Sequence, residues 1–264
     1  MPATVNATRI GLDAPSGRLS VLLAGNPADR AVLAVHGFGS SAELTWQATG
    51  HVRALVSAGC RVVAPDLPGH GTSHKPHDPG AYSLDGLVDD LAAVAAEVGG
   101  EQIDLLGYSL GARLSVALAA ALDRRLDRAV HRMVIGGYDD RRLFRGVDAV
   151  QLAQILKDPA AIVNADPETA RIAGIALAVP DNDLVALAAM VTGVPGTEHS
   201  TTPPGVPTLV VAGTADPLAS GAEHWAATLP NAQFLPVPGR DHISTVTAGV
   251  FRRRAAEFLT ALPS

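Results

Sequence analysis

The sequence predicts an α/β protein built on a mostly parallel sheet with helices on both faces. Short runs rich in Val, Leu and Ile alternate with longer stretches of helical periodicity, the pattern of parallel strands joined by crossover helices. The chain has 264 residues, of which 47% are hydrophobic and 17% charged. This length and composition are enough to bury a sizeable core as one domain with an insertion.

Six apolar runs are predicted to be strands, because each is short, largely apolar and bounded by turn residues. In chain order they are AVLAVH at 31–36, RVVAPD at 61–66, IDLLGY at 103–108, RMVIGG at 132–137, TLVVAG at 208–213 and QFLPVP at 233–238. Before them, TRIGL and LSVLLAG predict a short hairpin that turns around Pro15 to Gly17.

Helical patterns fill the intervals between these runs. In SLDGLVDDLAAVAAEVGG, apolar residues recur at helical spacing, Ser83 is the predicted N-cap, and Gly99 and Gly100 are the predicted stop. Three further helical stretches, near 148–157, 167–178 and 181–192, follow one another without a convincing strand between them.

We interpret these three stretches as an inserted helical cap. The predicted division is a core of residues 1–137 and 206–264 and a cap of residues 138–205. The Pro-rich segment TTPPGVP at the end of the cap is predicted to be a rigid return into the next strand. The alternative is an ordinary helical excursion that contacts no functional site.

Charge and composition argue against several classes of partner. The formal net charge is −6 and the arginine clusters are scattered, so we expect no nucleic acid partner. No apolar run reaches the roughly 18 residues that span a membrane, and MPATVNATRI lacks the features of a secretory signal. Cys60 has no cysteine partner and is expected to be a small buried hydrophobe. We expect a cytoplasmic protein that binds a small molecule and no membrane; the sequence leaves its oligomeric state open.

The stretch LLGYSLGARLS sets Ser109 between Gly107 and Gly111, where a predicted strand turns into a helix. A serine in this context is held on a sharp, exposed turn, and the glycines lack the Cβ atoms that would keep strand and helix apart. The helix N-terminus adds a positive dipole end and N–H groups. Ser109 is therefore the predicted nucleophile, and the alternative is a turn serine that only caps the helix.

A serine hydroxyl is a weak nucleophile until a base accepts its proton, so this hypothesis requires a histidine and an acid. His242 in GRDHIST and Asp216 in GTADPLA each follow a predicted strand. Carboxyl ends of parallel strands meet at one edge of a sheet, and Ser109 lies at the same edge. Asp139 and Asp140 in GGYDD are the alternative acids, although their place before RRLFR favours a solvated helix start with local ion pairs.

Acyl chemistry also requires two N–H groups directed at the developing oxyanion. The glycines of HGFGSS permit close approach of the backbone to a ligand, so we predict the N–H groups of Phe38 and Leu110 as the donors. His36 is predicted to brace this loop by a hydrogen bond rather than to act as a base.

The spacing of His70, His74 and His77 in GHGTSHKPH raises the question of a metal site. No convincing set of carboxylates or thiolates accompanies them, so we predict a turn-rich loop and no metal.

The motifs HGFG, DLPGHGTS, GYSLG, GTADP and GRDH, in this order over nearly the whole chain, resemble those of the α/β-hydrolase family. The resemblance implies an eight-stranded sheet whose first strands are antiparallel and a helical cap after the sixth strand. It also implies attack by the elbow serine through an acyl-enzyme, with no metal or cofactor. HGFG stands where some lipases carry HGGG, which argues against bulky tertiary-alcohol esters and against true lipase action.

We therefore expect a carboxylesterase-like serine hydrolase for a small or medium-sized, mostly apolar ester, thioester or lactone. Phe38, Tyr108, Phe144 and Met190 are the predicted substrate contacts, and the alternative is that such cap residues form only the cap's own core. A lyase, cyclase or carbon–carbon bond hydrolase ranks second, since fold alone assigns no reaction. A ligand receptor ranks third, because binding alone does not require an activated serine.

Overall fold

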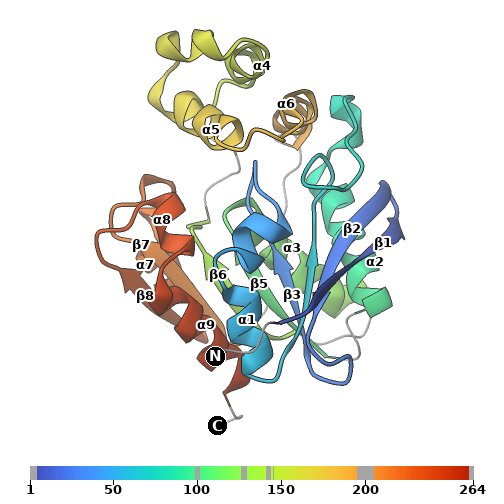
Figure 1. The fold of residues 1–264 in the computed structure, drawn as a ribbon. Helices are drawn as coiled ribbons and strands as arrows, with labels where there is room; N and C mark the ends of the chain where they lie inside the picture. The colour runs from blue at the N-terminus through green and yellow to red at the C-terminus, as the bar shows by residue number, and fades with distance from the viewer. Residues whose placement is uncertain are drawn as a thin grey trace.

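A computed structural model gives the fold of the chain (Figure 1). It describes residues 5–98, 102–125, 130–140, 144, 146–194 and 205–261. Eight strands form one sheet in the order β1-β2-β4-β3-β5-β6-β7-β8. The β1–β2 and β2–β4 pairs are antiparallel and the other pairs are parallel, so the predicted α/β fold with antiparallel first strands is confirmed.

The strands agree closely with the predicted apolar runs. Their bounds are β1 Ala7–Ala14, β2 Gly17–Ala24, β3 Ala31–Val35, β4 Arg61–Pro65, β5 Ile103–Tyr108, β6 Val130–Gly136, β7 Thr208–Gly213 and β8 Ala232–Val237. Every residue of β3, β5 and β7 is buried, because helices cover both faces, which is why these strands are largely apolar in sequence. The predicted hairpin pairs Ala14 with Gly17 across the turn of Pro15 and Ser16.

Helices cover both faces of the sheet (Figure 1). Their bounds are η1 Glu43–Gln47, α1 His51–Ser57, η2 Pro79–Ala81, α2 Leu84–Val98, α3 Leu110–Arg125, α4 Ala149–Lys157, η3 Pro159–Asn164, α5 Pro167–Leu177, α6 Leu184–Gly193, η5 Pro217–Ala219, α7 Ala222–Thr228, α8 His242–Val246 and α9 Gly249–Thr260. Ser83 Oγ accepts a hydrogen bond from Gly86 N at 3.0 Å and caps α2 as predicted. The predicted stop at Gly99 and Gly100 lies outside the described residues. None of the described helices is both long and apolar enough to cross a membrane.

The sheet separates two apolar clusters. Leu33 belongs to the cluster that includes side chains of α2 and α3, and its neighbour Val32 belongs to the cluster that includes α1 and α9. This alternation follows from the two-residue period of a strand. Cys60 is buried as predicted, and burial raises the pKa of its thiol to about 11. The core therefore holds β3 and β5 rigidly between two helical layers.

The helices α4, α5 and α6 lie between β6 and β7 in the chain and gather at one end of the sheet (Figure 1). They match the three predicted stretches, and η3 between α4 and α5 was not predicted. Side chains of Asp148, Asp166 and Asp183 accept hydrogen bonds from backbone N–H groups and fix the three helix starts. Residues 195–204 lie outside the described residues, so the rigid return and the exact division of the chain stay predictions.

Candidate active site

Ser109 lies on the turn between β5 and α3 with a φ of 55°, in the left-handed region that most L-residues avoid. Its backbone is held because Ser109 N donates to Gly136 O at 2.9 Å. A Cβ atom at Gly107 would come within 2.5 Å of Gly111 O, and one at Gly111 within 2.0 Å of Val35 O. Both glycines are therefore required for the close packing that presents Ser109 at the sheet edge.

His242 and Asp216 meet at this edge. His242 Nδ1 donates to Asp216 Oδ2 at 2.8 Å, and both residues are buried. Asp216 begins η5, and its Oδ1 accepts a hydrogen bond from Leu218 N at 2.9 Å, so both carboxylate oxygens are engaged. The carboxylate fixes the neutral ring with its proton on Nδ1, which leaves Nε2 as the acceptor.

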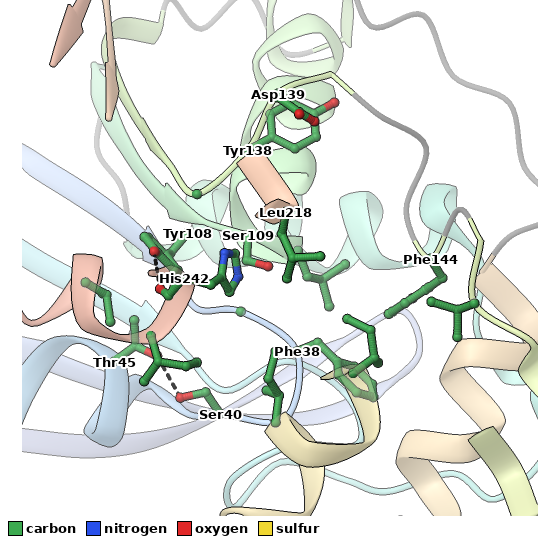
Figure 2. A pocket seen from close by; sticks show the side chains of 18 of the residues that line it. Phe38, Ser40, Thr45, Tyr108, Ser109, Tyr138, Asp139, Phe144, Leu218 and His242 are labelled. Carbon is green, nitrogen blue, oxygen red and sulfur yellow. Dashed lines mark hydrogen bonds between the residues drawn. The ribbon is translucent and has the colours of Figure 1, made fainter. Parts of the chain in front are cut away.

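The His242 ring and the Ser109 side chain point into the same part of one cavity (Figure 2). The structure has no hydrogen bond between the Ser109 hydroxyl and His242. Catalytic hydrogen bonds of this kind are often long in the absence of substrate and tighten when it binds. The arrangement places a hydroxyl, a basic nitrogen and a carboxylate in the order that nucleophilic catalysis uses.

Asp139, the alternative acid, has a different partner. Its Oδ2 accepts a hydrogen bond from Gly221 N at 2.9 Å, ahead of α7. It is 8% exposed and lines the cavity, so the predicted solvated helix start is wrong for this residue. The structure pairs the His242 ring with Asp216 rather than with Asp139.

The loop after β3 packs against the elbow. Phe38 and Leu110 both line the cavity, and a Cβ atom at Gly37 would lie 3.2 Å from Ser109 Cβ. Leu110 is the first residue of α3, so its N–H has no acceptor in a preceding helical turn. Neither Phe38 N nor Leu110 N donates a hydrogen bond to another described residue. Both residues predicted to donate to an oxyanion therefore line the cavity that contains Ser109.

Two buried histidines brace this loop. His36 Nδ1 donates to Gly37 O at 2.8 Å and its Nε2 accepts from Leu67 N at 3.0 Å. His70 Nε2 accepts from Gly39 N at 3.0 Å. Burial lowers the pKa of His36 and lowers the pKa of His70 to about 3. Both rings therefore stay neutral, and the unprotonated Nε2 of each can accept its backbone hydrogen bond. The bracing role predicted for His36 is confirmed, whereas the sequence analysis missed the same role for His70.

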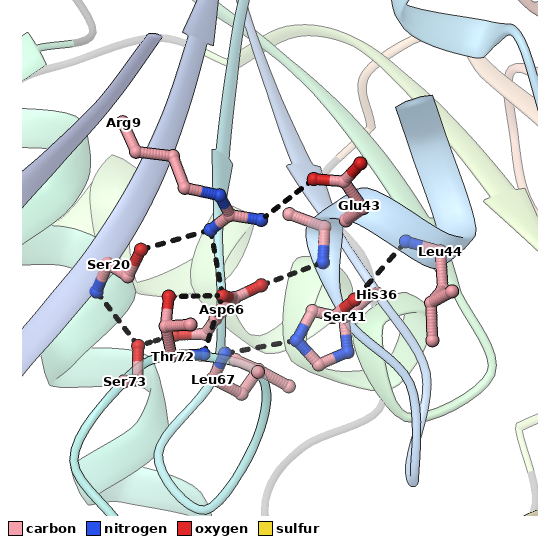
Figure 3. Close-up of polar contacts among 12 residues, drawn as sticks. Arg9, Ser20, His36, Ser41, Glu43, Leu44, Asp66, Leu67, Thr72 and Ser73 are labelled. Carbon is pink, nitrogen blue, oxygen red and sulfur yellow. Dashed lines mark hydrogen bonds and ion pairs between the residues drawn. The ribbon is translucent and has the colours of Figure 1, made fainter. Parts of the chain in front are cut away.

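Asp66 connects the segment that follows HGFG to other segments of the chain through hydrogen bonds (Figure 3). Its Oδ1 accepts from Ala42 N at 2.8 Å, and its Oδ2 accepts from Thr72 N at 3.0 Å and from the Arg9 guanidinium at 2.9 Å. Burial alone would raise the pKa of Asp66, but the hydrogen bonds from these N–H groups and the charge of Arg9 hold it below its usual value. DLPGHGTS is thus a support for the HGFG loop, a role that only long-range contacts reveal.

The three histidines of GHGTSHKPH have separate partners. His74 Nε2 forms a hydrogen bond with Ser16 Oγ at 2.9 Å, and His77 Nε2 pairs with Asp183 Oδ2 at 2.9 Å. His70 belongs to the loop described above. Each of the three rings therefore bonds to a different segment of the chain.

A cavity of about 470 Å³ opens above Ser109 (Figure 2), a volume that suits a small-molecule substrate. Phe38, Tyr108 and Phe144 line it, and the Phe38 and Phe144 rings pack edge to face with centroids 5.3 Å apart. Met190 does not line it: this side chain is fully buried within α6, so its prediction as a substrate contact is wrong. Met190 instead fits the alternative prediction, in which such residues form only the core of the inserted helices.

Tyr108 also contacts the histidine. Its hydroxyl donates to the backbone carbonyl of His242 at 2.5 Å, and the two ring centroids are 5.3 Å apart. The tyrosine therefore supports the residue that carries the basic nitrogen, which makes it a positioning residue in addition to a wall of the cavity.

We expect Tyr108→Phe to lower kcat by roughly three- to tenfold, because it removes one hydrogen bond that holds His242. KM should change less, since the ring remains in the wall. Steady-state kinetics beside a thermal melt check this result. A raised KM with unchanged kcat would instead assign Tyr108 to substrate contact alone.

Comparisons with known proteins agree with the fold. Residues 30–141 match the family described as the alpha/beta hydrolase fold. A segment is 36% identical over 101 residues to epoxide hydrolase A of Mycobacterium tuberculosis, and the match covers 38% of this chain and 30% of that protein. The matched segment thus spans less than a third of that relative's length.

Solved structures resemble the chain over nearly all of its length. A hydrolase from Pseudomonas aeruginosa PA01 has a TM-score of 0.71 at 23% identity, covering 96% of this chain and 99% of its own. The enol-lactonase from Burkholderia xenovorans LB400 has a TM-score of 0.75 at 21% identity, covering 96% and 100%. At these identities the likeness concerns the fold. The matched segment, the sheet order and these structures together show that the chain has the α/β-hydrolase fold.

Proposed function

We propose that this protein is a serine hydrolase that cleaves a small or medium-sized, mostly apolar carboxylic ester, thioester or lactone. The observation that carries the proposal is the Ser109 hydroxyl on a strained turn, in one cavity with a His242 ring that Asp216 fixes at 2.8 Å. An activated hydroxyl beside two backbone donors is the arrangement that acyl transfer requires.

In this mechanism Ser109 Oγ bonds to the carbonyl carbon while His242 Nε2 accepts its proton. The N–H groups of Phe38 and Leu110 stabilise the oxyanion, and Asp216 stabilises the charged ring. Collapse of the intermediate breaks the bond to the alcohol oxygen, which takes the proton from His242. Water then attacks the acyl-enzyme with His242 as base, and release of the acid returns the proton to Ser109.

The identity of the nucleophile separates this proposal from epoxide opening, the reaction in the name of one relative. A serine oxygen that opened an epoxide would form an ether, which has no carbonyl carbon for water to attack. Turnover would stop at that step. An acyl group on Ser109 is an ester that water hydrolyses, and the enol-lactonase that shares the fold acts, by its name, on a carbonyl compound of this kind.

A panel of p-nitrophenyl esters of increasing acyl length, thioesters and lactones tests the proposal, read beside labelling by a fluorophosphonate. We expect turnover of short to medium acyl chains and a label mapped by peptide analysis to Ser109. A label elsewhere would contradict the serine mechanism. A labelled Ser109 without turnover of any carbonyl substrate would favour the non-hydrolytic alternative.

The proposal includes a cap formed by α4 to α6 that sets acyl selectivity, since Phe144 and the α5 residues Ile172 and Ile175 line the cavity. Met190 is fully buried and does not line it. Phe144→Ala is expected to shift the preference toward longer or branched acyl chains by removing an aromatic wall. Met190→Ala is the matched control, and we expect it to lower stability and to leave the ranking of esters unchanged. Equal proportional losses for every ester in Phe144→Ala would contradict a role in selectivity.

A further inference from the structure

We infer that the alcohol part of the substrate carries a hydroxyl group that binds to the side chains of Ser40 and Thr45, while the acyl part is apolar. This inference rests on the proposed function, because it divides one ester between two parts of the cavity. The substrate class is then an ester of an apolar acid with a short diol or a similar hydroxylated alcohol.

The first observation is a pair of hydroxyls in the cavity wall. Ser40 Oγ and Thr45 Oγ1 form a hydrogen bond of 2.8 Å, both residues line the cavity, and Thr45 is 5% exposed. One shared bond uses one of the two O–H donors, so one donor and several lone pairs remain. No further partner for either hydroxyl lies among the described residues. A ligand oxygen in the cavity can accept from this remaining donor.

The carboxylates in the same wall are engaged within the protein. Glu168 pairs with Arg171 at 2.9 Å, and Asp139 accepts a hydrogen bond from Gly221 N at 2.9 Å. Unlike these ionised carboxylates, which can only accept, the hydroxyl pair also has an O–H donor left for a neutral polar ligand group. A neutral hydroxyl on the substrate both donates and accepts, as the pair does.

The second observation is the side of the cavity on which the pair lies. Ile243 and Val246 of α8 line the cavity as well, and α8 begins at His242. In Figure 2, Ser40 and Thr45 lie below His242, Phe38 lies to the right of Ser40, and Phe144 lies farther to the right. The hydroxyl pair thus lies at the end of the cavity that contains His242 and α8, and the Phe144 ring lies at the other end.

The chemistry assigns the two sides. His242 must lie within hydrogen-bond reach of the leaving oxygen to protonate it, so the alcohol begins at this ring and continues along α8 toward Thr45. The acyl group then extends toward the Phe38 and Phe144 rings, which are apolar walls of the cavity. An apolar acyl group is favoured there because it leaves no buried polar atom unpaired.

A matched pair of substrates tests this assignment: 2-hydroxyethyl butyrate and n-propyl butyrate, which differ by a hydroxyl in place of a methyl. We expect kcat/KM of the parent protein to favour the hydroxyethyl ester by roughly three- to tenfold, the value of one or two neutral hydrogen bonds. Thr45→Val replaces a hydroxyl with a methyl of similar shape and should bring this ratio close to one. Ser40→Ala should reduce the ratio in the same direction.

Thr192→Val is the control, because this threonine lies on α6 and is exposed, and among the described residues its hydroxyl bonds only to Ala188 O of its own helix, at 2.9 Å. Its ratio should equal that of the parent. Equal kcat/KM for both esters in the parent, or a preference that survives in both Thr45→Val and Ser40→Ala, overturns the inference and leaves the proposed function intact. Absence of cleavage of both esters together with absence of a label at Ser109 overturns both. The parent ratio and Ser40→Ala decide the question if Thr45→Val does not fold.

Discussion

Ser109→Ala is expected to lower kcat by about 10⁴-fold or more for every ester that the parent hydrolyses, by analogy with serine hydrolases that lose their nucleophile. The variant keeps the cavity, the oxyanion donors and the His242 base, but no oxygen remains to form the acyl-enzyme. Residual turnover would reflect water activated by His242 near the donors. Initial rates at saturating substrate and loss of fluorophosphonate labelling measure the effect.

Ser115→Ala is the matched control for this substitution. Ser115 lies on the same helix, is fully buried, and its hydroxyl donates to Gly111 O at 2.7 Å without lining the cavity. We expect a modest loss of stability of about 1 kcal/mol from the lost hydrogen bond and kcat within about tenfold of the parent. A folded Ser109→Ala protein that retains most of its turnover would contradict the covalent mechanism.

The sequence was most informative where a single local constraint decides the structure. The strands β3, β5 and β7 are buried on both faces, so their composition alone marks them. Gly107 and Gly111 mark the elbow because a Cβ atom at either position would collide with neighbouring backbone. The order of the motifs along the strands predicts that Ser109, Asp216 and His242 lie at one edge of the sheet.

Roles that depend on contacts between distant segments were not predictable in the same way. The assignment of Met190 failed because six consecutive residues of α6, 186–191, are buried and apolar, so the sequence does not show which side meets the cavity. His70 and Asp66 act on the HGFG loop from another part of the chain, across 31 residues for the bond between Gly39 and His70. The pairing of Ser40 with Thr45 likewise follows from the shape of η1, which the sequence did not predict.

Asp216→Asn is expected to lower kcat on the order of 10⁴-fold while the protein stays folded, the loss seen when the triad carboxylate of a serine protease becomes an amide. The amide nitrogen would donate to Nδ1, so the ring would carry its proton on Nε2 and could not accept one from Ser109. An amide oxygen can still accept the hydrogen bond that Leu218 N now donates at 2.9 Å, so the turn into η5 should persist.

Asp139→Asn is the control that distinguishes the two acids. Its side-chain oxygen can still accept from Gly221 N, and His242 is bonded to Asp216, so kcat should stay within about tenfold of the parent. Thermal melts of both variants establish that loss of activity is not loss of fold. Proton transfer from Ser109 requires the one carboxylate that holds the His242 ring in the accepting tautomer. A folded Asp216→Asn enzyme with near-parent kcat, beside an inactive Asp139→Asn enzyme, would therefore assign the role of that carboxylate to Asp139 at the end of β6.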